Sequence, residues 1–186
     1  MRYSSNHKAE TRKRIIGEAS RRFRKDGVEG TGLVPLMKAL GLTHGGFYAH
    51  FASKDALVEA SLASAAEQSF ERWPEPRDSE ELLAFVASYL SPEHRDEPDE
   101  GCPLPSLCAE LGLRGNPSAT SDILVQRMTQ RLEGAELRSN PSERSLVALA
   151  AMVGAITLAR AVKDPAASDQ ILAAVRSAIR APSQET

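Results

Sequence analysis

The chain has 186 residues, of which 41% are hydrophobic and 26% are charged, with a net charge of −2. This composition is enough for a packed core of one or two compact units and is not that of a membrane protein. No apolar run approaches the ~20 residues of a membrane span and the polar N-terminus has no apolar signal segment, so we expect a cytoplasmic protein with reduced cysteines.

The near-neutral total hides two regions of opposite charge. Residues 1–55 contain 11 Lys and Arg against 5 Asp and Glu, whereas the other 131 residues contain 12 against 20. The first region therefore carries a net charge of +6 and the second −8. A polyanion such as DNA is attracted by positive charge. If the protein binds DNA, only the first region is therefore expected to bind it.

The first predicted helix covers about residues 8–26. Four apolar residues between Ile15 and Phe23 lie at helical spacing among eight Lys and Arg residues, a pattern typical of an amphipathic helix with one buried face. Most of the basic side chains are expected in solvent, and only a few face phosphate. Asp26 and Gly27 end the helix, since glycine readily takes the left-handed conformation.

A second short helix is predicted over about residues 33–40. Thr31 or Gly32 can cap its start, and Pro35 falls in its first turn, where a missing backbone N–H is harmless. The residues expected on its buried face are Leu33, Leu36, Met37 and Leu40.

A third short helix follows a tight connection at Gly41, and Thr43 is expected to cap it through its hydroxyl. Phe47 and Phe51 are four residues apart, so both should point inward and hold this helix on the domain. Ser53 is expected to cap the next helix. Two short helices joined by a glycine turn and braced by a longer first helix are typical of a helix-turn-helix, whose last helix reads DNA.

The residue types of this third helix suit the major groove of DNA. Gly45 and Gly46 remove side chains from its leading edge, and because glycine costs about 1 kcal/mol in a helix interior, the pair needs a compensating reason such as close approach to the bases. Thr43 and His44 offer hydrogen-bonding groups to base edges. The side chains placed to meet phosphate oxygens are Tyr48, His50 and Lys54.

The stretch LTHGGFYAHF, followed by SKDAL, resembles the DNA-binding domain of the TetR family of transcriptional regulators, and the resemblance covers about residues 8–60. It implies a dimer on a palindromic operator. It also implies base contacts from Thr43, His44, Gly45 and Gly46 and backbone contacts from Tyr48, His50 and Lys54. We therefore expect a helix-turn-helix DNA-binding domain over residues 1–53 and a helical effector-binding and dimerisation domain over residues 54–186.

Beyond residue 53 the chain is predicted to be wholly helical, because apolar residues recur at spacings of three and four and no run alternates with period two. The polar stretch SPEHRDEPDEG is expected to be a surface loop with too little apolar content to pack. Asn116, Asn140 and Asp164, each followed by proline, are expected to cap the last three helices. These later helices, which bring the total to about nine, are expected over 54–73, 79–90, from GCPLPSLCAEL onward, and over 117–137, 141–163 and 166–181.

The eighth predicted helix, SLVALAAMVGAITLARA, is apolar on nearly every side and must be covered on more than one face. A four-helix homodimer interface made by the last two helices of each subunit would cover it, as is usual in the TetR family. The alternative is that both helices simply complete the core of one subunit. The residues assigned to the interface are Leu149, Met152, Val153, Ile156, Ile171, Leu172, Val175 and Ile179.

The family's central helices usually enclose a pocket for a small-molecule effector. Aromatic residues and methionine at helical spacing also occur as ordinary core, so the individual assignments compete with that interpretation. The residues assigned to the pocket are Phe70, Trp73, Phe85, Tyr89, Cys102, Leu104, Leu107 and Met128.

The two cysteines are the other residues whose side chains could be chemically reactive. Cys102 precedes Pro103 at the start of a predicted helix, where the helix dipole would lower the pKa of its thiol and favour a sensor of oxidants or electrophiles. The competing interpretation is that Cys102 and Cys108 are small apolar packing residues. No catalytic residue, cofactor or metal site is predicted, because the four histidines lie in different elements and none has zinc-site spacing.

Three functions compete for this sequence. A thiol-dependent enzyme lacks a convincing base or CxxC pair, and a helical protein-interaction module leaves the glycine-rich helix unexplained. The third, a dimeric transcriptional repressor released from a palindromic operator by a small molecule, accounts for the most residues. A regulator responding to oxidants or electrophiles through Cys102 is the alternative form of that function.

Overall fold

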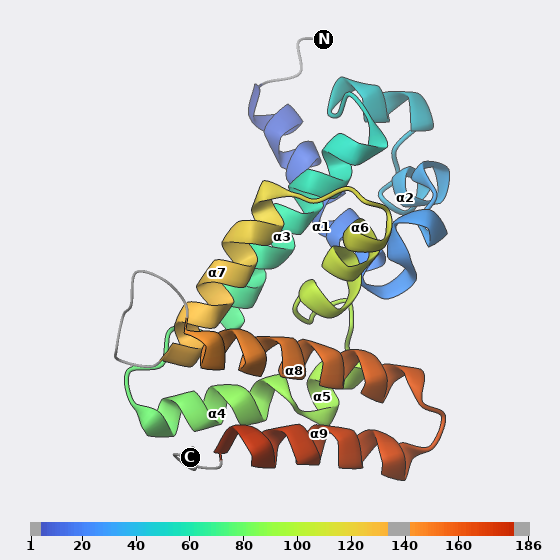
Figure 1. The fold of residues 1–186 in the computed structure, drawn as a ribbon. Coiled ribbons are helices and arrows are strands. Elements are labelled where there is room, and N and C mark those ends of the chain that lie inside the picture. The colour runs from blue at the N-terminus through green and yellow to red at the C-terminus, as the bar shows by residue number, and fades with distance from the viewer. Residues whose placement is uncertain (1–4, 134–141, 181–186) are drawn as a thin grey trace. The chain divides into compact units, whose positions relative to one another are not determined.

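The computed structural model describes residues 5–133 and 142–180, and every regular element in these ranges is helical (Figure 1). A 3₁₀ helix, η1, covers His44–Ala49, and a π-helix, η2, covers Leu104–Cys108. The all-α fold predicted from the sequence is confirmed. The nine α-helices of the described ranges are α1 Ser5–Gly30, α2 Leu33–Ala39, α3 Lys54–Arg72, α4 Ser79–Tyr89, α5 Pro92–Asp96, α6 Ala109–Leu113, α7 Ala119–Glu133, α8 Glu143–Ala161 and α9 Pro165–Arg180.

Packing divides the chain into two compact units. The first contains the described residues up to Ser69 together with Pro98–Ser121. The second contains Phe70–Glu97 and the described residues from Asp122 onward. The packing boundary thus differs from the predicted functional boundary at residues 53 and 54, because α3, η2 and α6 contribute apolar side chains to the same core as the helix-turn-helix.

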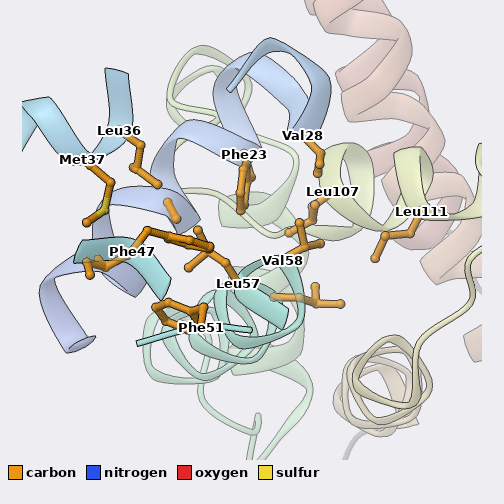
Figure 2. Close-up of a cluster of buried hydrophobic side chains, with 13 residues drawn as sticks. Phe23, Val28, Leu36, Met37, Phe47, Phe51, Leu57, Val58, Leu107 and Leu111 are labelled. Atoms are coloured by element: carbon orange, nitrogen blue, oxygen red, sulfur yellow. The ribbon is translucent and has the colours of Figure 1, made fainter. Parts of the chain in front are cut away.

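One hydrophobic cluster holds the first unit together. Phe23 from α1, Phe47 from η1 and Leu57 from α3 are fully buried in it, and Figure 2 shows them turned toward a common centre. Leu107 from η2 and Leu111 from α6 extend the cluster. Burying one such side chain contributes roughly 1.5–3 kcal/mol, so this core fixes the short helices that could not be stable alone.

Helix α1 is interrupted at Gly27, whose backbone has φ 76° and ψ 167°. This conformation favours glycine, and it confirms the predicted end of the regular helix at this position. The interruption leaves the N–H of Val28 without a helical acceptor, and that N–H donates to Oε2 of Glu110 in α6 at 2.7 Å. The segment that leads to α2 is therefore capped at its start by a carboxylate from a distant element.

Arg24 is a basic side chain of α1 that is buried rather than solvated. Its guanidinium donates to the backbone oxygens of Ser20 and Gly101, at 3.2 and 2.7 Å, and to the side-chain oxygen of Gln68 at 2.8 Å. These bonds join α1 to α3 and to the segment that precedes η2.

The connection between α2 and η1 turns at Gly41, where φ is 72°. The N–H groups of Gly41 and Leu42 donate to carbonyls in the last turn of α2, at 3.0 and 2.9 Å, which is a Schellman motif. The predicted tight connection is confirmed. At the other end of α2, Gly32 occupies the N-cap position, while the Thr31 hydroxyl donates to the carbonyl of Gly27 at 2.8 Å.

In the second unit, α8 and α9 run antiparallel side by side and α4 also packs on α9 (Figure 1). Side chains of α5 reinforce this arrangement, since Arg95 donates to Asp169 of α9 at 2.7 Å. Arg160 of α8 in turn donates to the carbonyls of His94 and Arg95, at 2.7 and 2.9 Å. Short polar links of this kind hold α5 on the pair formed by α8 and α9.

The polar stretch SPEHRDEPDEG is not the unpacked surface loop that its composition predicts, because it contains α5. The Ser91 hydroxyl caps this short helix by accepting from the N–H of His94 at 3.2 Å. The His94 side chain is fully buried, with its ring centroid 4.9 Å from that of Trp73 and 4.6 Å from that of Tyr89. The hydropathy pattern missed this anchor because histidine counts as polar, although its ring packs well against aromatic side chains.

Two of the three predicted caps differ in detail. The N–H of Ala166 donates to the carboxylate of Asp164 at 3.0 Å, so the cap of α9 is confirmed. Helix α7 begins later than predicted, and there the Ser118 hydroxyl, not Asn116, accepts from the N–H of Thr120 at 3.1 Å. Asn140 lies outside the described residues, and the Ser142 hydroxyl caps α8 by accepting from the N–H of Ser145 at 3.2 Å.

The expectation that no segment approaches a membrane span needs correction for α8. This helix has 19 residues and an 18-residue window of mean hydropathy 1.5, with 33% of the window buried, so it meets the length and composition of a span. A single such helix is weak evidence for a membrane protein, because a core helix of a soluble protein has the same composition.

Candidate nucleic-acid interface

The helix predicted to read DNA is a 3₁₀ helix rather than an α-helix. The N–H of Gly46 donates to the Thr43 carbonyl at 3.0 Å and that of His50 to the Phe47 carbonyl at 2.9 Å, which are bonds between residues three apart. The Thr43 hydroxyl also accepts from the N–H of Gly46 at 3.2 Å, so the predicted cap is present. Two of the six residues of this helix are glycines, which are poor α-helix formers, and this accounts for the difference.

The side chains of η1 divide into a buried face and an exposed face. Phe47 and Phe51 are buried with their rings stacked 5.6 Å apart, as predicted from their spacing. Tyr48 is 59% exposed, and its ring packs edge-to-face with the His44 ring, with 5.8 Å between the two ring centroids. The aromatic anchors therefore hold η1 while the polar side chains face outward.

The other residues assigned to DNA contact lie on or beside the same element. Thr43 and Gly45 are exposed, whereas Gly46, His50 and Lys54 are half-buried. Lys54 begins α3, whose N-terminus is capped by the Ser53 hydroxyl through the N–H of Ala56 at 3.1 Å. The first unit thus brings all seven predicted residues into one continuous segment, and their contact with DNA stays a prediction.

Gly45 has no intramolecular reason to be glycine. A Cβ built on it meets no atom of residues 5–133 or 142–180 within 4 Å, and its φ does not lie in the left-handed region. A Cβ on Gly46 would lie 3.3 Å from the Thr43 hydroxyl, which is a tight contact. The fold therefore accounts in part for Gly46, while the space beside Gly45 is open to an external partner.

Two arginines of α1 support this face in ways the sequence did not reveal. The Arg12 guanidinium lies 4.6 Å from the centroid of the Phe51 ring, and Arg14 donates to the carbonyl of Leu40 at 3.1 Å. Both had the spacing of ordinary solvated residues, because their partners come from other elements. They attach the long first helix to the residues that follow α2 and η1.

The residues assigned to an effector pocket fall into both packing units. Leu104 and Leu107 are buried in the first unit with Cys102. The others, Phe70, Trp73, Phe85, Tyr89 and Met128, are buried in the second.

A groove of about 490 Å³ lies beside two of these residues in the second unit. Trp73 is held there by donating from its Nε1 to the Ser88 hydroxyl at 3.1 Å. The groove therefore has an aromatic wall and enough room for a ligand of moderate size. Its lining includes Trp73, Pro74, Pro76, Ala84, Phe85 and Ser88, together with the charged residues Arg72, Glu75, Arg77 and Glu81.

Neither cysteine has the features of an accessible thiolate. Cys102 is fully buried and Cys108 is half-buried. Burial raises the pKa of Cys108 to about 11, so its thiol stays protonated at neutral pH. The alternative of a thiol-based sensor is consequently not favoured.

Some of the residues assigned to a dimer interface are already buried within the single chain, and the others are not. Leu149, Met152, Ile156 and Leu172 are buried within it, so they pack inside this unit instead of presenting a surface. The sequence pattern missed this division because α8 is apolar on both faces. The half-buried members of the predicted set are Val153, Ile171, Val175 and Ile179.

The opposite face of α8 is the exposed one. Leu146, Val147 and Leu158 are 43%, 68% and 57% exposed, and Ala150 lies between them on the same side. Together these four residues form the α8 outer face.

A glycine turn, buried aromatic anchors and an exposed polar edge define a helix-turn-helix protein of the DNA-binding class. The model of the bacterial regulatory proteins of the tetR family matches residues 15–61. The HTH-type transcriptional regulator UidR of Escherichia coli K12 is 27% identical over 122 residues, which are 64% of this chain and 60% of UidR.

Solved structures are similar along nearly the whole chain. A TetR transcriptional regulator from Chloroflexus aurantiacus aligns with a TM-score of 0.72 and 23% identity, covering 94% of this chain and 96% of that one. AibR, in complex with isovaleryl coenzyme A and operator DNA, aligns with a TM-score of 0.54 and 17% identity over 90% and 96%.

Residues 15–61 thus match the DNA-binding domain of the tetR family of bacterial regulatory proteins, and the chain has the fold of solved TetR-family regulators. The family and the relatives found are transcriptional regulators rather than enzymes. The alignment spans about 60% of the length of the curated relative, so the partners of that protein do not transfer directly.

Proposed function

We propose that this protein is a cytoplasmic repressor that binds a palindromic operator as a homodimer, with η1 in the major groove, and leaves it when a small molecule binds. The observation that carries the proposal is Gly45, which is exposed on η1 with open space where a Cβ would stand. An external surface that must come very close to the backbone explains this glycine, and the floor of the major groove is such a surface.

The operator is tested by selection from random duplex DNA at physiological salt. We expect enrichment of a palindrome with half-sites about 34 Å apart, because a two-fold dimer presents two copies of η1. The absence of any enriched sequence would contradict the proposal and favour the interaction-module alternative.

The role of Gly45 is tested by comparing Gly45→Ala with Gly17→Ala. Both positions leave room for a methyl group within the chain, so both variants should fold. Gly45→Ala should bind the operator about 100-fold more weakly, comparable to a mismatched base pair or two at about 1–3 kcal/mol each. Gly17 lies on α1, so Gly17→Ala should bind the operator as the wild type does. Equal affinity of the two variants for the operator would exclude close approach of DNA at Gly45.

The homodimer is supported by the α8 outer face. An apolar surface of Leu146, Val147 and Leu158 on a helix whose other face is already buried is unfavourable in water. A second copy of the same helix, related by a two-fold axis, would cover it with matching apolar side chains.

The effector site is proposed at the groove beside Trp73 and Phe85. Its volume and mostly apolar walls favour a small, largely apolar molecule. Trp73 is the single tryptophan of the chain, so its fluorescence reports occupancy directly. Anilinonaphthalene sulfonate should quench Trp73 emission in the wild type and not in Ala84→Phe, which fills the groove; equal quenching in both would exclude this site.

A further inference from the structure

His50 differs from the other polar residues of the interface because its ring is enclosed on one side. It follows η1, and its Nδ1 is buried with no hydrogen-bond partner in the described structure. The titratable groups that act on it are His7, Lys8 and Arg12, all on α1. Arg12 also lies over the ring of the adjacent Phe51.

These surroundings oppose a positive charge on the imidazole. Burial, and then the neighbouring Lys8, Arg12 and His7, lower the pKa of His50 below its usual value. An imidazolium would carry a proton on both ring nitrogens, and the proton on Nδ1 would be buried without an acceptor. The neutral ring with its proton on Nε2 avoids this unmet donor.

We propose that His50 contacts a DNA phosphate as a neutral imidazole that donates its Nε2–H, while nearby cations of α1 supply the charge. The proposal rests on the proposed DNA-binding function and specifies how one residue of that site works. Its consequence is that His50 fixes the position of the backbone without linking operator binding to proton uptake. The positive charges of Lys8 and Arg12 help to keep the His50 imidazole neutral, and they also attract the phosphate.

The primary test measures protons taken up on binding the selected operator. Isothermal titrations at pH 6.5 in buffers of different ionisation enthalpy give this number for the wild type and for His50→Gln. The glutamine amide places an N–H near the position of Nε2–H but does not titrate. We expect equal proton uptake in the two proteins and affinities within about threefold; an excess of about half a proton or more per subunit in the wild type would overturn the proposal.

Two further variants separate this role from a purely structural one. His50→Ala should bind about tenfold more weakly than His50→Gln, since it lacks the donor. Arg12→Gln removes one neighbouring cation but leaves Nδ1 buried and Lys8 in place, so the dependence of its operator affinity on pH between 7.5 and 5.5 should match that of Arg12→Gln/His50→Gln. A pH-dependent rise already present in the wild type and abolished by His50→Gln would contradict the neutral donor.

Two results distinguish the protonation state of His50 from DNA binding itself. A wild-type protein that selects an operator and takes up a proton at His50 overturns only the neutral donor. A wild-type protein that selects no DNA sequence overturns both.

Discussion

The exposed edge of η1 and the α8 outer face are both surfaces that the packing of their own unit leaves uncovered, yet their chemistry is opposite. The η1 edge presents glycine, a phenol and imidazoles with basic residues nearby, whereas the α8 outer face presents Leu146, Val147 and Leu158. The first suits a charged, hydrated polymer and the second suits another apolar surface. The side chains of a surface that stays uncovered after folding therefore indicate the kind of partner that would bind there.

The largest expected effect separates the two surfaces by breaking the dimer. Leu158→Asp places a carboxylate twice in a two-fold interface, where burying unpaired charge costs several kcal/mol, and should weaken dimerisation about 1,000-fold. Analytical ultracentrifugation and operator binding should both show this weakening. Leu113→Asp, at a leucine 90% exposed in the other unit, is the matched control and should remain dimeric; a dimeric Leu158→Asp would refute the α8 interface.

The second effect concerns the core that supports the α8 surface. Burial lowers the pKa of His94 to about 4, despite the close contact of its Nδ1 with the Tyr89 carbonyl at 2.6 Å. The unfolded chain binds a proton near pH 6.5 and the folded one does not, so stability present above pH 6.5 declines as pH falls toward 4. Between pH 7.5 and 5 the decrease in the free energy of unfolding is about 2 kcal/mol.

Chemical denaturation at these two pH values measures that decrease. His94→Asn keeps a donor toward the Tyr89 carbonyl but does not titrate, so its stability should fall less over the same interval. His50 contributes with the same sign, and the difference between wild type and His94→Asn isolates His94. An identical pH dependence in the two proteins would show that His94 does not control acid stability.

The smallest expected effect is on the salt dependence of DNA binding at the exposed edge of η1. Lys54→Gln removes a charge, so it should reduce the slope of log affinity against log salt by about 0.9 for each phosphate that is no longer neutralised, or about 2 for a dimer. Tyr48→Phe removes only a hydroxyl and should weaken binding without changing the slope. Fluorescence anisotropy across a salt series distinguishes the two, and an unchanged slope in Lys54→Gln would show that Lys54 does not bind phosphate.

Elements whose signals are local could be predicted from the amino-acid sequence alone. The spacing of Phe47 and Phe51, the glycine at position 41 and the capping hydroxyls of Thr43 and Ser53 each depend on residues within one turn, so they could be read directly. The all-helical class followed from periodicity in the same way. These are the features that locate the candidate DNA-binding face.

The packing of distant segments, in contrast, sets which apolar residues are covered and which polar residues are buried. Leu149 and Leu158 look alike along α8, but one packs inside the unit and the other faces outward. His94 and Arg24 carry polar side chains, yet both are buried because aromatic rings or backbone oxygens from distant segments meet them. Burial depends on partners remote in sequence, and no local pattern contains that information.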